Sequence, residues 1–190
     1  MDEKEMVDLP IHLIQHSASR LQRLSINTAY GHGLEDEYHL MSRLYAAQVT
    51  LGIREFILHE ARVGSSGAFI QFLSSCKQSL VKLSLVSNSL DSGNWASVFR
   101  VLSSRFTSLT EIHTYLLRDP DSLIHFPAVL QEPIVDPVLG TKFSYTLKEF
   151  RTGQTVTLMV AYSGSGMDVA LQKLADYATP WKRKRSRITS

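Results

Sequence analysis

The sequence has little cysteine, with one residue, Cys76, among 190. A single thiol excludes an intramolecular disulfide framework and, because no cysteine and histidine residues stand at the spacing of a zinc site, we expect no metal. No apolar run approaches the roughly 18 residues that cross a membrane. The acidic residues 1–5 lack the basic and apolar parts of a secretory signal. These absences predict an intracellular protein, nuclear or cytoplasmic, with no membrane partner.

Basic residues are scarce outside the C-terminal tail, although the formal net charge is +2. Five of the 20 lysine and arginine residues lie in 182–187, which leaves 15 against 18 acidic residues elsewhere. A nucleic-acid-binding domain carries its basic residues over a folded face, so we expect no nucleic acid to bind the folded part. The tail matches a short nuclear import signal, and a solvated terminus explains it equally well. The residues of this cluster are Lys182, Arg183, Lys184 and Arg185.

One apolar phrase restarts along the chain. It reads Ile53-x-x-Phe56-x-Leu58, then Leu80-x-x-Leu83-x-Leu85, then Leu109-x-x-Ile112, and an earlier copy begins at Leu21. From position 53 to 80 is 27 residues and from 80 to 109 is 29. These distances fit the period of about 20–29 residues in leucine-rich repeats. The middle copy continues through Asn88 and Leu90 without a mismatch to that repeat.

A polar turn and a segment with helical spacing follow the restarts. Glycines mark the turns at 30–33, 64–67 and 91–94, and apolar residues recur at helical spacing in 34–49, 69–73 and 95–102. Strands that alternate with helices through short connections are parallel. One such unit cannot cover its own apolar face, so about three or more must stack. We therefore predict an α/β fold, a short leucine-rich-repeat solenoid over residues 1–118, with parallel strands on one face and helices on the other.

The C-terminal third departs from this pattern. Four of the six prolines fall in 119–140, which we expect to be a connection with one short helix near 122–125. Two β-prone runs, 143–150 and 155–162, predict a hairpin. A helix is expected at 167–177, and hairpin and helix together (141–178) are expected to cap the solenoid, with 179–190 as a disordered basic tail. The expected apolar stripe of this helix is Val169, Ala170, Leu174 and Tyr177.

The residues between the apolar strand positions are expected to share the exposed concave face of the sheet. From this set we predict six partner-binding residues: Arg54, Glu55, Lys82, Ser84, Glu111 and His113. Lys82 stands between Glu55 and Glu111 in register, so cross-strand ion pairs are the alternative explanation for these charges. Asn88 occupies the position whose amide satisfies backbone groups in the turn that leaves the strand.

Residues 80–102 carry the most specific part of a family resemblance. The units resemble leucine-rich repeats of the ribonuclease-inhibitor kind, and more narrowly the C-terminal half of fungal F-box-type proteins. The segments that carry the narrower likeness are 83–85, 90–95, the helix face with Phe99 and Leu102, and 167–171. In that family an F-box recruits a ubiquitin-ligase scaffold and the repeats select the substrate.

Residues 1–20 are shorter than an F-box, so the resemblance implies the recognition half alone. The implied function is a non-catalytic module that binds a protein partner of unknown identity through the strand face. Its narrower form is the substrate-recognition part of a ubiquitin-ligase adaptor, with ligase components as partners.

Two further patterns allow a chemical interpretation. Gly164-x-Gly166 follows a strand and opens a helix, as in a dinucleotide loop, but Val169 takes the third glycine position, so a tight turn is favoured and no cofactor is expected. The alternative is an α/β enzyme with a site at the 163–167 loop. His12 and His16 have the spacing of one helix face but lack a third metal ligand. His59 and His113 can bind or catalyse only if the fold brings other groups to them.

Overall fold

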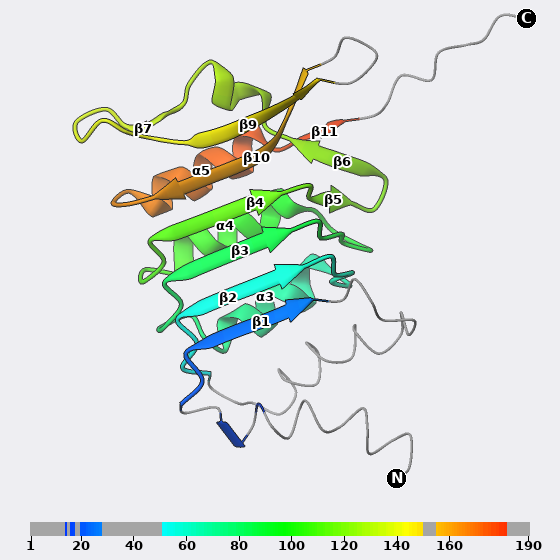
Figure 1. Ribbon diagram of the computed structural model, residues 1–190, viewed down its shortest axis with the longest axis vertical. Coiled ribbons are helices and arrows are strands. Elements are labelled where there is room, and N and C mark those ends of the chain that lie inside the picture. Colours follow the sequence, from blue (N-terminus) through cyan, green and yellow to red (C-terminus); the bar gives the residue numbers. More distant parts are fainter. Residues whose placement is uncertain (1–13, 15, 18–19, 28–50, 150–154, 182–190) are drawn as a thin grey trace, which may run out of the picture.

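A computed structural model describes residues 14, 16–17, 20–27, 51–149 and 155–181. Its main sheet has six strands in the order β1-β2-β3-β4-β10-β9, and three α-helices lie behind it (Figure 1). The strands are β1 (Arg23–Asn27), β2 (Glu55–His59), β3 (Lys82–Val86), β4 (Glu111–Tyr115), β9 (Ser144–Glu149) and β10 (Thr155–Ser163). The helices are α3 (Ser66–Ser74), α4 (Trp95–Arg105) and α5 (Met167–Tyr177). The predicted α/β class is confirmed as a mixed sheet with helices. Among the described residues, no helix is long and apolar enough to cross a membrane.

The first four strands are parallel and pair in one register. Leu24, Phe56, Leu83 and Ile112 are direct neighbours across β1 to β4, and all four side chains are buried. The apolar phrase therefore points into the core, toward α3 and α4, as its spacing predicts. Because side chains alternate across a strand, the intervening residues lie on the opposite face of the sheet.

The helices begin where polar residues cap them. The Ser65 hydroxyl accepts a hydrogen bond from the Ala68 N–H at 3.0 Å, and the Asn94 side chain accepts one from the Ser97 N–H at 2.8 Å. These bonds satisfy backbone donors of the first helical turn. Behind the sheet, the helices contribute to an aromatic row in which Phe56 contacts both Phe72 and Phe69, and the row continues from Phe69 through Trp95 and Phe99 to Phe126. Burial of this row holds the parallel units together.

Asn88 joins two consecutive units. Its side chain is fully buried, and its Oδ1 accepts a hydrogen bond from the Ala61 N–H at 3.0 Å. Its Nδ2 donates to the Leu58 carbonyl oxygen, also at 3.0 Å. The predicted role of this amide is confirmed, and the backbone groups that it satisfies belong to the preceding unit.

The predicted hairpin is confirmed and joins the main sheet. β9 and β10 are antiparallel, and β10 pairs antiparallel with β4, so the parallel order ends at β4. The helix predicted at 167–177 is α5, but Val169 is 44% exposed and Leu171 is buried in its place. The stripe prediction was wrong there because the helix buries the side that faces both α4 and β10, which 3.6-residue spacing alone does not select.

The expected short helix near 122–125 is wrong. Ser122–His125 forms strand β6, which pairs with β5 (Arg118–Asp119) and with β11 (Thr179–Trp181) in a separate sheet. β11 also occupies the start of the predicted disordered tail. The rest of the connection holds a 3-10 helix, η1 (Pro127–Leu130), and a small antiparallel pair, β7 (Ile134–Asp136) and β8 (Thr141–Lys142). The predicted helix at 34–49 and the basic cluster at 182–185 lie outside the described residues.

Candidate interaction face

The side of the main sheet opposite the helices is here called the strand face. It forms an open concavity of about 450 Å³. All six strands of the main sheet contribute residues to its lining. Residues that line it include Arg23, Glu55, Ile57, His59, Lys82, Ser84, Glu111, His113, Ser144, Ala161 and Ser163.

Register places these residues in rows across the strands. The first row is Arg23, Glu55, Lys82, Glu111 and Ser163, and the second is Ser25, Ile57, Ser84, His113, Ala161 and Ser144. The first row carries four formal charges of alternating sign, whereas the second carries none and sets the apolar Ile57 among polar and small residues. A rigid sheet thus presents a charged row beside an uncharged one.

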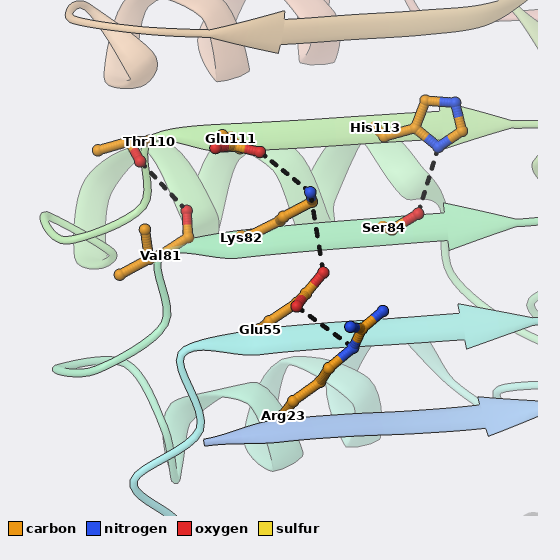
Figure 2. A network of polar contacts seen from close by, with 8 residues as sticks. All are labelled: Arg23, Glu55, Val81, Lys82, Ser84, Thr110, Glu111 and His113. Carbon is orange, nitrogen blue, oxygen red and sulfur yellow. Dashed lines mark hydrogen bonds and ion pairs between the residues drawn. The ribbon is translucent and has the colours of Figure 1, made fainter.

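The charged row is connected by ion pairs (Figure 2). Lys82 Nζ lies 3.3 Å from Glu111 Oε2 and 3.8 Å from Glu55 Oε1. Arg23 Nε lies 3.3 Å from Glu55 Oε2. The predicted position of Lys82 between two carboxylates is confirmed. Ion pairs this exposed contribute little stability, up to about 1 kcal/mol each, so their main effect is to fix the positions of the four charged groups.

A hydroxyl–imidazole pair lies in the second row. The Ser84 Oγ is 3.2 Å from the His113 Nδ1 (Figure 2). Burial lowers the pKa of His113 below its ordinary value of 6.5, and the nearby His59 and Lys82 lower it further. The neutral ring is therefore favoured at pH 7, where it donates or accepts a hydrogen bond without adding charge.

The structure brings five of the six predicted partner-binding residues together. Glu55, Lys82, Ser84, Glu111 and His113 all line the concavity. Arg54 does not, because β2 begins one residue later, and the exposed Arg54 lies in the bend before it. The backbone N–H of Arg54 donates instead to the Gln22 carbonyl oxygen at 2.7 Å.

Sequence reasoning missed other residues of this face. Arg23 and His59 continue the same alternation by one step along β1 and β2, and that signal was present in the repeat. Ser144, Ala161 and Ser163 reach the face only because β10 pairs with β4. No local pattern indicates this pairing, because antiparallel addition to a parallel sheet depends on contacts far apart in sequence.

The 163–167 loop is a structural turn. Gly164 and Gly166 have positive φ values of 129° and 76°, a region that favours glycine. The Tyr162 hydroxyl donates to the Ser165 carbonyl oxygen and lies 3.0 Å from the Thr141 hydroxyl. β10 is antiparallel to β4, and the chain continues from α5 into β11 of another sheet. A dinucleotide loop belongs to a parallel strand–helix–strand unit, and this arrangement lacks one.

Other potentially reactive groups are separate from the strand face. Within the described residues, no group of three or more histidine, cysteine or acidic side chains could hold a metal ion. His12 lies outside those residues. Cys76 is buried, and burial raises the pKa of its thiol to about 12, so the nucleophilic thiolate is suppressed at pH 7.

Fold and face together define a mixed α/β protein with an open polar surface on its sheet. Comparisons with protein-family models, curated proteins and solved structures give no match. The case for function therefore rests on the geometry of the strand face.

Acidification is expected to destabilise the fold partly through His113. A histidine whose pKa is lowered by folding binds fewer protons in the folded state, so stability is lost as pH falls through the unfolded value of about 6.5. Burial lowers the pKa of His125 in the same direction. In urea unfolding at pH 7.5 and 5.5, His113→Gln should lose less stability on acidification than the wild type, and adding His125→Gln should reduce the loss again.

An equal loss of stability in the wild type and in His113→Gln would show that the strand face does not disfavour a charged imidazole.

Proposed function

We propose that this chain is a non-catalytic protein-recognition module, a short leucine-rich-repeat solenoid that binds a protein partner through its strand face. Repeated strand, turn and helix units in one parallel register support the repeat assignment. The Asn88 amide supports it further, because it bonds the backbone of the preceding unit, as expected for this repeat position.

The observation that carries the proposal is the ordered polar surface on the uncovered side of the sheet. Helices α3, α4 and α5 pack behind the sheet, and no described helix lies over the strand face (Figure 1). Side chains on adjacent strands are held at fixed spacing, so they present one rigid pattern to a partner. A preformed surface loses little conformational entropy on binding, which favours recognition.

The charges indicate what a partner must offer. Two cations and two carboxylates in the first row balance, so the row attracts neither strongly acidic nor strongly basic segments over long range. Hydrogen-bonding groups of Ser84, His113 and Ser144 lie in the row beside it. We expect a partner surface of alternating charge next to neutral polar groups, with specificity from complementarity.

A narrower form of the proposal is that the module selects substrates for a ubiquitin ligase. The resemblance of residues 80–102 to fungal F-box-type proteins supports this form. The enzyme alternative at 163–167 has less support, since the loop follows a strand that is antiparallel to its neighbour and Tyr162 ties it to β8.

Quantitative affinity capture tests the proposal. The tagged chain is used to recover partners from its own cells, followed by mass spectrometry and binding measurements with the leading protein. The variant Lys82→Ala/His113→Ala should bind that protein at least tenfold more weakly, because it removes the centre of both rows. Tenfold corresponds to about 1.4 kcal/mol of binding free energy.

A matched control lies on the helix side. Arg100 is also an exposed cation paired with a carboxylate, its Nη2 lying 3.5 Å from Asp176 Oδ1. Arg100→Ala should bind like the wild type. Recognition through the strand face would be contradicted if Lys82→Ala/His113→Ala bound the partner as tightly as the wild type and Arg100→Ala lost binding. Recovery of ligase scaffold proteins by the wild type would support the narrower form.

A further inference from the structure

β9 leaves one edge of the main sheet open. It is the last strand in the sheet order and, within the described part of the chain, pairs only with β10. All six of its residues, Ser144–Glu149, are exposed. An edge strand of this length presents alternate N–H and C=O groups that can pair with another strand.

The edge has few features that prevent such pairing. Residues 144–149 contain no proline or glycine. The register shift between β9 and β10 skips a residue of β10, between Thr157 and Met159, so the extra residue is in β10 and not in the edge strand. Natural sheets protect edges with prolines, bulges or charges. Lys148 and Glu149 place charge only at one end of this strand, so its first four residues, 144–147, are open to pairing.

β9 also carries exposed apolar side chains on one face. Tyr145 is 40% exposed and Leu147 is 45% exposed. Tyr145 pairs with the buried Val160 of β10, which places both apolar residues on the helix side of the sheet. Ser144 lines the strand face, so Thr146 and Lys148 share that opposite side.

We propose that two copies of this chain pair antiparallel through β9, about a twofold axis at Thr146, and join their six-stranded sheets into one. A twofold axis perpendicular to a sheet sets residues of the same face opposite one another. Centred on Thr146, it sets Tyr145 opposite Leu147 of the second copy, and Leu147 opposite Tyr145. Both exposed apolar residues are covered at once, as aromatic–aliphatic cross-strand pairs.

The neighbouring registers are worse. An axis at Leu147 sets Tyr145 opposite Glu149 and brings the two copies of Lys148 into diagonal contact. An axis at Tyr145 sets Lys148 opposite Lys142 of the second copy. The axis at Thr146 opposes no like charges, since Lys148 then faces Ser144. Because the edge is complementary to itself in this one register, a second copy fits it better than an unrelated extended peptide.

Sedimentation equilibrium of the full chain, over a range up to about 1 mM, tests the pairing. The wild type should form a dimer. Tyr145→Lys and Leu147→Glu should each weaken dimerisation at least tenfold, because each buries a charge against an apolar side chain. The combined variant Tyr145→Lys/Leu147→Glu should dimerise again, since each lysine then faces a glutamate of the second copy. That recovery is specific to the axis at Thr146.

Controls separate this pairing from general effects. Val169 on α5 is 44% exposed, close to the 45% of Leu147. Val169→Glu therefore adds the same charge as Leu147→Glu at a similar exposure, and it should leave the dimer unchanged. The strand-face variant Lys82→Ala/His113→Ala should also dimerise normally, which keeps this proposal independent of the proposed function. Circular dichroism should show folded protein for every variant.

Three outcomes would overturn the proposal. The first is a monomeric wild type over the whole concentration range, including one whose β9 edge binds an extended peptide instead. The second is a dimer that neither single variant weakens. The third is a folded Tyr145→Lys/Leu147→Glu variant that stays monomeric.

Discussion

Replacing Trp95 by alanine is expected to lower the free energy of unfolding by about 3–5 kcal/mol. The side chain is fully buried, and its ring centroid lies 5.7 Å from Phe69 and 6.4 Å from Phe99. The alanine variant leaves a cavity between α3 and α4, in the middle of the aromatic row. It also removes the Nε1–H that donates to the Arg118 carbonyl oxygen at 2.9 Å. Packing and hydrogen bonding are lost at one position, which explains the size of the effect.

Urea unfolding followed by circular dichroism measures this loss without relying on tryptophan fluorescence. Trp95→Phe retains an aromatic ring but removes one of the two donors to the Arg118 carbonyl oxygen, which keeps the Leu90 N–H, so its stability should fall between those of the wild type and the alanine variant. A loss below about 1 kcal/mol for Trp95→Ala would place the residue at the surface and contradict the described core.

Replacing Asn88 by alanine is expected to lower the free energy of unfolding by about 2–4 kcal/mol. The buried amide bonds the Ala61 N–H and the Leu58 carbonyl oxygen, and the variant leaves the Ala61 N–H without this acceptor and removes one donor from the Leu58 carbonyl oxygen. Each buried polar group that loses its partner costs about 1–3 kcal/mol. The loss should appear as a lower midpoint of urea unfolding.

Two other variants make this prediction specific. Asn88→Asp keeps an acceptor for the Ala61 N–H but buries a carboxylate near the Leu58 carbonyl oxygen, so its instability should lessen at low pH, where the protonated acid donates. Asn94 is an exposed asparagine that caps α4, and Asn94→Ala should cost only about 1 kcal/mol. Equal losses for Asn88→Ala and Asn94→Ala would show that the Asn88 bonds do not couple the units.

Local pattern predicted the parallel part of the fold well. The repeat spacing predicted buried positions at Leu83, Leu85 and Asn88, and all three side chains are buried. The prediction works because each unit packs in the same way against its neighbours. The pattern failed where partners are distant in sequence. Ser122–His125 becomes a strand because β11 reaches back to pair with it, and nothing within four residues indicates that contact.

The candidate site was predictable to the same extent. Register alone placed Lys82 between Glu55 and Glu111, since parallel strands with a fixed repeat align equivalent residues. It misplaced Arg54, because β2 begins at Glu55, one residue after Arg54. The contribution of β10 required a change of strand direction, which depends on long-range pairing and not on spacing.

The change of direction at β4 also limits how such a chain can lengthen over evolution. β10 meets β4 antiparallel, whereas β1 to β4 pair through one repeated parallel register. A duplicated strand–helix unit inserted between β2 and β4 would find equivalent neighbours on both sides. The same unit inserted after β4 would displace β10 from its partner. Growth by internal duplication is therefore confined to the parallel segment, and the hairpin stays at the end of the sheet while the strand face widens.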